Sequence, residues 1–298
     1  MTDTTSTSAG RTVLLCGAQG FIGHNLARRL QQRGYQVRAA SRRSQPPVDF
    51  ARMRSAADWR PHLQGVDLVV NAVGSLRGTA QTPLSAVHAQ APMALFDACA
   101  ELGIRRVLQL SALGVEGNDT DYARTKREAD RHLQALVAAG RLGGAIVRPS
   151  IVMGAGGAST QLFMRLSLLP ALLLPQPMLH RQIQPLAVGD LADAMLNLLE
   201  SDHTGLVELG GPERLSMAGL IASLRRQRGL RPALVRALPD WMSHTTARLG
   251  DAVPASPWCS SALELASHDN CCDPAPLREW LRREPLSPAE LLRSIQHD

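Results

Sequence analysis

Two residues with complementary proton chemistry lie four positions apart in this sequence. Tyr122 and Lys126 form the pattern YxxxK, and residues at this spacing share one face of a helix. A nearby ammonium lowers the pKa of a phenol, so Tyr122 is expected to exchange a proton with a carbonyl or alcohol oxygen near neutral pH. Lys126 is the only lysine among 32 basic residues. The pair is a candidate acid–base centre; the alternative is an exposed helical pair.

Three regularly spaced glycines mark a second candidate site near the start of the chain. Residues 13–16 are apolar and predict a buried strand, which Gly17, Gly20 and Gly23 follow before an amphipathic helix that ends near Gly34. Glycines here allow a tight turn, let a pyrophosphate approach the backbone and let the helix pack on the strand. Free amides and the helix dipole then hold the phosphates. The pattern predicts the first unit of a dinucleotide-binding Rossmann fold rather than an ordinary glycine-rich turn.

The end of the second predicted strand, residues 35–41, distinguishes between two cofactors. A carboxylate there binds the ribose 2′-hydroxyl of NAD, whereas an arginine neutralises the 2′-phosphate of NADP. The sequence has Ser41, Arg42 and Arg43 and no acid. We therefore expect NADP(H) to be favoured over NAD(H); the alternative is that these are solvated loop arginines.

Further apolar runs predict the rest of a parallel sheet. Residues 48–50 predict a short third strand, and the near-continuous apolar run at 65–74 predicts a fully buried fourth one. Its carboxyl end lies where ligands bind in open α/β sheets, and the small residues Ala72 and Gly74 leave room there for a ribose. The other predicted elements are a helix at 58–63 capped by Ala57 or Asp58 with Trp59 in the core, a helix at 84–102, and strands at 106–111 and 144–147. His88 in the second helix is expected to be a packed or solvated histidine rather than a catalytic one.

The GxxGxxG spacing, with Phe21 and Ile22 between the last two glycines, resembles the extended branch of the short-chain dehydrogenase/reductase superfamily. The resemblance implies that Asp49 lies near the adenine amino group and that the backbone after Pro149 flanks the nicotinamide amide. Lys126 is expected to hydrogen-bond the nicotinamide ribose. The predicted cofactor-binding residues are Gly17, Gln19, Gly20, Phe21, Ile22, Gly23, Ser41, Arg42, Arg43, Asp49, Phe50, Asn71, Ala72, Val73, Gly74, Tyr122, Lys126 and Pro149.

The loop after the predicted strand at 106–111 departs from the catalytically competent relatives. They place a serine or threonine hydroxyl beside the tyrosine, and extended members place it just after the strand end. That position is Ala112 here, and Ser111 is the only substitute. The predicted catalytic residues are Tyr122, Lys126 and Ser111.

A glycine motif, SALG at residues 111–114 and then YxxxK after a short loop resemble one atypical subgroup: the NADPH-binding accessory subunit of respiratory complex I and its bacterial relatives. The resemblance covers residues 11–240. It implies that some members hold the nucleotide as a structural element without an assigned reaction. Further matching stretches are residues 71–74, 148–154, 184–190 and 208–213.

The bulk composition limits the class of protein. A chain of 298 residues can bury one large core with a smaller appended lobe. Despite the net charge of +6 we expect no nucleic-acid partner, because the arginines are spread over the predicted helices and aromatic residues are only 3% of the chain. The most apolar stretch, residues 162–175, contains Arg165 and two prolines, so we expect no transmembrane segment.

Cysteine and histidine usage gives no metal or disulfide pattern. The five cysteines have neither zinc-site nor disulfide spacing, which fits a reducing cytoplasm, and none of the nine histidines is paired at metal-ligand spacing. We therefore expect a cytoplasmic protein without a metal site.

The fold prediction is an α/β protein: a Rossmann doubly wound parallel sheet with a small C-terminal α/β lobe. We expect a disordered tail at 1–11, the core at 12–155, and a remainder at 156–298 that returns to the sheet and forms the lobe. Predicted features of this remainder are a Pro-interrupted helix pair at 162–174, Asp190 as N-cap of a helix at 191–199, a strand at 206–209, Ser216 as N-cap of a helix at 217–228, and a last helix after Ser287 and Pro288 with Glu290 in its capping pattern.

Two functions remain open. The first is an NADP(H)-dependent oxidoreductase or epimerase acting on an unidentified small molecule, which the intact Tyr122–Lys126 pair favours. The second is a non-catalytic NADP(H)-binding protein that assembles with a protein partner, which Ala112 and the unremarkable lobe favour.

Overall fold

The computed structural model describes residues 10–253 and 258–297, which form two compact units. The first unit runs up to Val115 and takes in Asp121–Arg148 and Ala192–Val207. The second consists of Glu116–Thr120, Pro149–Leu191 and the chain from Glu208 onward. The predicted tail at 1–11 lies almost entirely outside the described residues.

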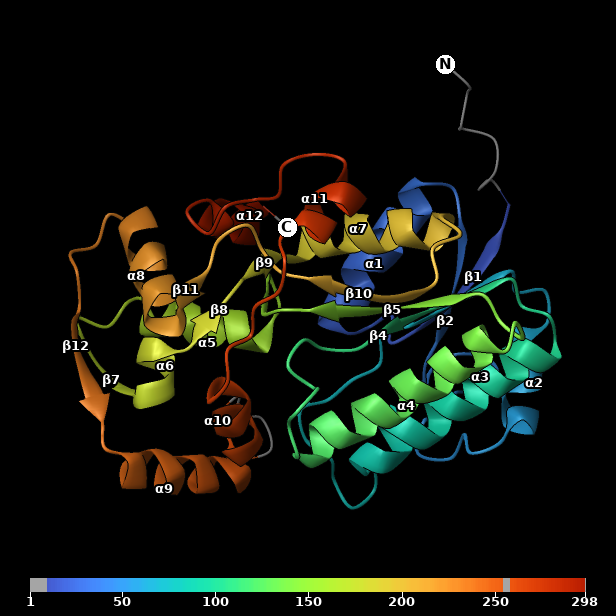
Figure 1. Cartoon of the computed structure of the whole chain (residues 1–298), viewed down its shortest axis with the longest axis horizontal. Coiled ribbons are helices and arrows are strands. Elements are labelled where there is room, and N and C mark those ends of the chain that lie inside the picture. Colours follow the sequence, from blue (N-terminus) through green and yellow to red (C-terminus); the bar gives the residue numbers. More distant parts are fainter. Residues whose placement is uncertain (1–9, 254–257, 298) are drawn as a thin grey trace. The chain divides into compact units, whose positions relative to one another are not determined.

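A six-stranded sheet forms the centre of the first unit. Its strands are β1 Thr12–Cys16, β2 Gln36–Ala40, β3 Leu68–Asn71, β4 Arg106–Leu110, β5 Gly144–Pro149 and β10 Gly205–Leu209. Their order is β10-β5-β4-β3-β1-β2 (Figure 1), and β2, β1, β3, β4 and β5 are joined by parallel pairings. The predicted Rossmann sheet is thus confirmed. The order reverses between β1 and β3, where ligands of such sheets bind.

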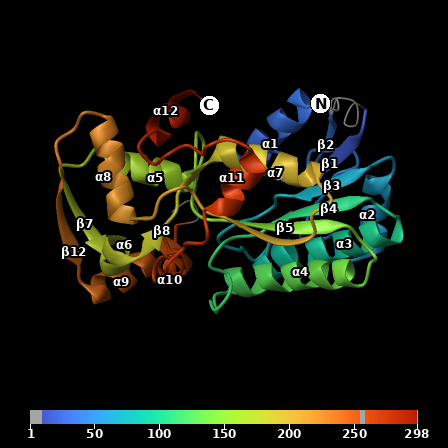
Figure 2. The same ribbon diagram turned by 45° about the horizontal axis from the view of Figure 1, so that its top comes forward.

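Helices cover both faces of this sheet. They are α1 Phe21–Gln32, α2 Ala56–Leu63, a π-helix at Ser85–Gln90, α3 Ala91–Glu101, α4 Asp121–Ala138 and α7 Val188–Glu200. Figure 2 shows α2, α3 and α4 on one face and α1 and α7 on the other. Ion pairs of 2.9 Å, Arg29 to Asp193 and Arg33 to Glu200, join α1 to α7.

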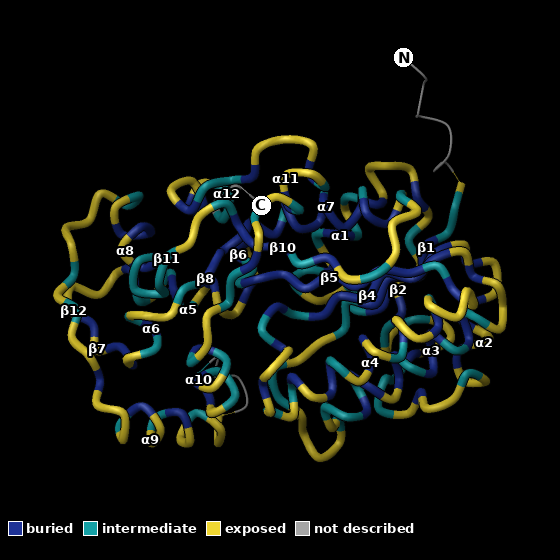
Figure 3. Tube along the Cα trace, in the orientation of Figure 1, coloured by how far each residue is buried: buried dark blue, intermediate teal, exposed yellow. Residues whose placement is uncertain are grey.

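The core of the first unit packs between the sheet and α2, α3 and α4. Trp59 is fully buried there, as predicted, and its indole N–H donates to the carbonyl oxygen of Ala91 at 3.1 Å. The ring of Phe50 meets Trp59 edge-on with centroids 5.4 Å apart. Figure 3 shows the resulting contrast between buried strands and exposed loops.

The predicted strand at 48–50 is wrong. Val48 is buried in the core, but the chain then turns, and the N–H groups of Arg52 and Met53 donate to the carbonyl oxygen of Asp49. The YxxxK helix therefore follows the fourth strand along the chain. The predicted cap of α2 is also wrong, because Ser55 precedes the helix and donates to Asp58 Oδ2 through both its N–H and its hydroxyl.

The helix predicted at 84–102 is present but begins differently. Its first part, Ser85–Gln90, is a π-helix that leads directly into α3. Pro92 has no N–H to donate four residues back, so a regular α-helical ladder cannot run through this point. A π-helical turn contains more residues than an α-helical turn, so its side chains point in directions that differ from those in a regular α-helix.

The second unit combines short strand pairs with helices. Pairings join β6 Val152–Met153 to β9 Leu186–Ala187, β8 Gln182–Ile183 to β11 Leu215–Ser216, and β7 Ala171–Pro175 to β12 Leu234–Leu238. Its helices are α5 Ala158–Leu166, α6 Gln176–His180, α8 Met217–Gln227, α9 Asp240–Asp251, α10 Ser260–Ala266, α11 Ala275–Leu281 and α12 Leu291–His297. A core cluster around Phe163, Met178 and Leu224 holds these elements together.

The predicted helix pair at 162–174 is half wrong. The first half is α5, but the second half is the strand β7, which finds a parallel partner in β12. A short apolar run has no period that separates a strand from a buried helix, so only the partner strand decides. No helix among the described residues is both long and apolar enough to span a membrane.

Asp190 is not the N-cap of α7, because that helix begins at Val188. Its buried carboxylate instead accepts from the Arg283 guanidinium at 2.7 Å and from the N–H of Leu286 at 2.8 Å. Ser216 caps α8 as predicted, with its hydroxyl accepting from the N–H of Gly219. Glu290 contacts Ser287 as predicted, in a turn that precedes α12.

Candidate functional site

The turn between β1 and α1 is too tight for any side chain at two of its glycines. Gly17 has a φ of +82°, and a Cβ there would lie 2.8 Å from the carbonyl oxygen of Ala72. A Cβ on Gly23 would lie 2.1 Å from the carbonyl oxygen of Gly17. Both distances are far below van der Waals contact. The glycines therefore hold β1, α1 and the end of β3 together.

The N-terminus of α1 is open to an anion. Gly20 is its N-cap residue in an extended conformation, and the first turn contains no acidic side chain. The N–H of Gly20 donates to the carbonyl oxygen of Gly17 at 2.9 Å. Phe21, Ile22 and Gly23 then form the first turn of the helix. Amides in a first turn have no partner within the helix, and the dipole favours negative charge beside them.

A cavity of about 380 Å³ lies against this turn, entirely within the first unit. Nine predicted cofactor residues line it: Gly17, Gln19, Gly20, Ser41, Arg42, Arg43, Asp49, Phe50 and Val73. Six lining residues were not predicted: Ala18, Ala40, Val48, Ala51, Thr82 and Val87. The glycine cradle and this cavity fit the phosphates and one nucleoside of a dinucleotide.

The loop after β2 presents two arginines at the cavity. The N–H of Arg43 donates to Ser41 Oγ at 3.1 Å, and the hydroxyl of Ser44 donates to the carbonyl oxygen of Ser41 at 2.7 Å, so the loop is internally braced. Arg42 and Arg43 are exposed, and neither forms an ion pair within the described part of the chain. Asp49 accepts from the N–H of Ala51. The guanidinium groups are available for an anionic group in the cavity.

The end of β3 forms the floor of the site. Asn71 is fully buried; its side-chain amide donates to Gln109 Oε1 at 2.8 Å, and its Oδ1 accepts from the N–H of Val73. Asn71 therefore shapes the strand end rather than lining the cavity. A Cβ on Gly74 would lie 3.2 Å from Lys126 Nζ, so the small residue predicted here makes room for the ammonium.

Lys126 is buried, with its ammonium at the ends of two strands. Nζ donates to the carbonyl oxygen of Leu110 at 3.0 Å and to that of Val73 at 3.3 Å. Burial lowers the pKa of Lys126 to about 8, against the Asp130 carboxylate, which raises it. The group can thus lose its charge just above neutral pH.

The half-buried Tyr122 does not have the lowered pKa expected from its neighbour. Burial raises the pKa of Tyr122 to about 12, and the Asp130 carboxylate adds to the effect. The Lys126 ammonium, which donates to two backbone carbonyls, does not lower the pKa of Tyr122. Tyr122 therefore keeps its proton at neutral pH.

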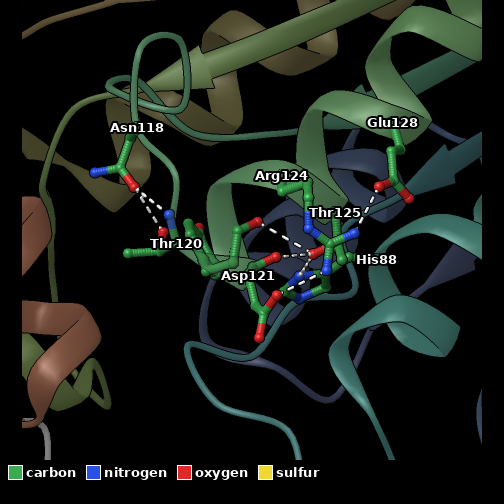
Figure 4. A network of polar contacts seen from close by, with 8 residues as sticks. His88, Asn118, Thr120, Asp121, Arg124, Thr125 and Glu128 are labelled. Atoms are coloured by element: carbon green, nitrogen blue, oxygen red, sulfur yellow. Dashed lines mark hydrogen bonds and ion pairs between the residues drawn. The ribbon is translucent and has the colours of Figure 1, made fainter.

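His88, on the π-helix, packs against Tyr122 with perpendicular rings whose centroids lie 5.4 Å apart. Its Nε2 accepts from the N–H of Ser75 at 3.0 Å. The Thr125 hydroxyl donates to the carbonyl oxygen of Asp121, so it accepts from His88 Nδ1 at 3.3 Å (Figure 4). Burial lowers the pKa of His88 to about 3, and the Lys126 ammonium adds to this. The neutral ring supports Tyr122, so of the two predicted alternatives, a packed or a solvated histidine, the structure shows the packed one.

Ser111 donates its hydroxyl proton to Asp130 Oδ2 at 2.7 Å. The same oxygen accepts from Arg148 Nε at 3.1 Å and from a terminal nitrogen of that guanidinium at 2.9 Å, and all three residues are buried. Burial raises the pKa of Asp130, against Ser111 and Arg148, which lower it. The role predicted for Ser111 toward a substrate stays a prediction, and in this structure its proton is already shared.

Sequence reasoning missed the roles of Asp130 and Arg148. Asp130 lies four residues after Lys126 and therefore on the same helix face, and a charged Arg148 inside a buried strand requires an anionic neighbour. These two signals together would have found the pair. Pro149 is the last residue of β5 and belongs to the second unit, so its place beside the nicotinamide stays a prediction.

We expect Gly23→Ala to lower the melting temperature and to abolish its increase with NADPH, because the new Cβ would collide with the backbone of Gly17. A thermal-melt titration measures both effects. Gly219→Ala in α8 is the matched control, since its Cβ would meet nothing closer than 3.4 Å. A wild-type response from Gly23→Ala would contradict the tight packing of this turn.

Comparison with known proteins assigns the family. A model of the NAD dependent epimerase/dehydratase family matches residues 13–210. The chain belongs to this family. The predicted resemblance to the extended short-chain dehydrogenase/reductases is thus confirmed, while the narrower resemblance to a complex I accessory subunit is not confirmed by these matches.

Individual relatives are distant. Ceramide reductase of Caulobacter vibrioides is 26% identical over 92% of this chain and 90% of its own length. Sterol demethylase protein B of Methylococcus capsulatus is 28% identical over 48% of this chain and 52% of its own length. The NAD complex of UDP-glucose 4-epimerase from Thermus thermophilus is 17% identical, with a TM-score of 0.70 over 96% of this chain and 98% of that one. This last similarity shows a shared fold.

Proposed function

We propose that this chain is an NADP(H)-dependent oxidoreductase that acts on a carbonyl or alcohol group. The supporting observation is the position of Lys126, whose ammonium lies at the carboxyl ends of β3 and β4 and four residues from a protonated phenol. The carbonyl of Val73 joins this pair to the dinucleotide cavity, because Val73 also lines that cavity.

Tyr122 and Lys126 have separate roles in the proposed reaction. When bound, NADPH would supply the hydride for a substrate carbonyl. Tyr122 holds its proton at neutral pH and can donate it to the carbonyl oxygen as a general acid. The Lys126 ammonium would hold a ribose hydroxyl of the nucleotide and favour the negative charge that develops on the phenol oxygen. At neutral pH Tyr122 is in the protonated form, which is the form that reduction of a ketone requires.

The preference for NADP(H) rests on Arg42 and Arg43. Both guanidinium groups border the cavity without a carboxylate partner among the described residues, which suits a 2′-phosphate. The epimerase of the same fold was solved with NAD, so the preference needs its own test. The name of one relative, a ceramide reductase, favours a reductase. Ceramides and sterols, which the names of both relatives contain, are lipids, so ketones of lipids are the first substrates to screen. Epimerisation would use the same Tyr122–Lys126 pair.

A second function is favoured by Ser111 and Ala112. The hydroxyl of Ser111 is engaged by Asp130, and Ala112 offers none, so neither of these two side chains is free to polarise a substrate carbonyl. A protein of this kind could hold NADP(H) as a structural element within a larger assembly. NADPH binding without turnover of any carbonyl substrate would support this second function.

A thermal-melt titration with NADPH and NADH tests the cofactor proposal. At equal concentration the ligand that binds more tightly stabilises the folded state more, and we expect the larger shift from NADPH. Arg42→Ala combined with Arg43→Ala should lower the affinity for NADPH by about tenfold or more and leave the affinity for NADH unchanged, because only NADPH carries the 2′-phosphate. The control is Arg28→Ala on the exposed side of α1. No shift with either nucleotide would overturn both functions.

A further inference from the structure

The strand pair β7 and β12 exposes leucines on its outer side. Leu172 and Leu174 of β7 point into the core of the second unit, while Leu173 between them is 64% exposed. Leu234 of β12 pairs in register with Ala171 and is 57% exposed. A strand directs alternate side chains to opposite faces, so Leu173 and Leu234 belong to one outward face.

Further apolar side chains are exposed next to these two strands in the chain. Leu168 and Leu169 lead into β7 and are 54% and 47% exposed, and the N–H of Leu234 donates to the carbonyl oxygen of Pro170 beside them. Trp241 follows the end of β12 in the first turn of α9 and is 69% exposed. Figure 3 shows exposed residues along β7, β12 and α9. We call Leu168, Leu169, Leu173, Leu234 and Trp241 the β7–β12 face.

The same part of the chain is strongly basic. Residues 158–181 and 214–239, which form α5, β7, α6, α8 and β12, contain no aspartate or glutamate. They contain eight arginines: Arg165, Arg181, Arg214, Arg225, Arg226, Arg228, Arg231 and Arg236. Arg236 pairs in register with Leu173 and therefore lies on the face itself. These two segments hold eight of the chain's 31 arginines and none of its 26 acidic residues.

Arg225 is the buried arginine of this set, and backbone carbonyl oxygens rather than carboxylates accept its hydrogen bonds. Arg225 donates to the carbonyl oxygens of Ser167, Leu169 and Arg231. It thereby orders the chain that carries Leu168 and Leu169. The six exposed arginines retain their charge at the surface: Arg165, Arg181, Arg214, Arg226, Arg231 and Arg236.

We propose that the β7–β12 face docks on the surface of an anionic lipid bilayer. Exposed leucines and a tryptophan enter the boundary between headgroups and acyl chains, while arginines around them bind the lipid phosphates and keep their charge in water. Nucleic acid fits less well, because its bases stack on aromatic side chains and Trp241 is the only aromatic residue of the face. An anionic bilayer offers both an apolar region for the leucines and phosphates for the arginines.

Co-flotation of the full chain with vesicles tests the proposal. We expect binding to vesicles of phosphatidylcholine with phosphatidylglycerol, weaker binding to phosphatidylcholine alone, and release at high salt. Leu173→Gln combined with Leu234→Gln should weaken binding at least tenfold through the lost apolar contact. Arg236→Gln should weaken it by about fivefold. All three side chains are exposed, so the melting temperature should not change.

Matched controls are Leu102→Gln and Arg28→Gln, an exposed leucine and an exposed arginine of the first unit. Both should bind vesicles like the unaltered chain. The proposal is overturned if vesicles are not bound, if the Leu173 and Leu234 variant binds as well as its control, or if the face variants lose binding to a single-stranded oligonucleotide instead. The measurement needs no turnover, so it stands apart from the outcome for the proposed enzyme.

Discussion

Tyr122→Phe should lower the rate of carbonyl reduction by about 10²–10⁴-fold, because the variant has no proton to donate to the substrate oxygen. The change removes one hydroxyl and keeps the ring that packs on His88. The NADPH-dependent rise in melting temperature should therefore remain nearly intact. NADPH oxidation with an accepted ketone measures the rate, and a thermal-melt titration measures binding.

The chain offers a matched control, since its second tyrosine carries an equally replaceable hydroxyl. Tyr35 donates to Glu200 Oε1 at 3.3 Å, far along the chain from α4, and Tyr35→Phe should keep full turnover. The rate of reduction should decline as pH rises through about 8, where Lys126 loses its charge. Loss of the Tyr122 proton alone would instead place the decline near pH 12. Equal turnover by Tyr122→Phe and the unaltered chain would remove Tyr122 from the mechanism.

Asp130→Asn should destabilise the first unit by about 3–5 kcal/mol, because it leaves the buried Arg148 guanidinium without its carboxylate. Both side chains are almost completely buried, so solvent cannot replace the lost charge. For a chain of this size the melting temperature should drop by about 10 °C. Urea unfolding followed by circular dichroism measures the loss.

Two comparisons show whether the buried charge is the cause. Asp130→Asn combined with Arg148→Met removes both charges and should recover most of the lost stability. Glu101→Gln breaks the exposed ion pair with Arg60 and should cost less than about 1 kcal/mol. If the double variant were as unstable as Asp130→Asn alone, the cost would come from packing and not from an uncompensated charge.

The sequence was most informative where one local conformation needs one residue type. Gly17 and Gly23 were predicted from a glycine turn, and the structure gives both a backbone contact that excludes a Cβ. The parallel strands were predicted from continuous apolar runs, which few other elements contain. Trp59 and Ser216 were predicted correctly because a large apolar ring and an N-cap hydroxyl have narrow structural uses.

The sequence was least informative where a distant partner decides. Residues 171–175 became a strand because β12 lies beside them, and Asp190 bonds to Arg283, 93 residues further along the chain. Ser111 was predicted near a substrate, and in the structure its hydroxyl donates a hydrogen bond to Asp130 of α4. Neither β12 nor Arg283 leaves a mark in the local pattern around these residues.

The amino-acid sequence by itself determined the Rossmann sheet, the glycine cradle and the spacing of Tyr122 and Lys126, because each depends on residues close together in the chain. Only the tertiary structure decided the electrostatics of that pair. Burial raises the pKa of Tyr122 to about 12 and lowers that of Lys126 to about 8, because desolvation depends on everything that packs around a group. The order of residues along a helix contains no measure of that packing.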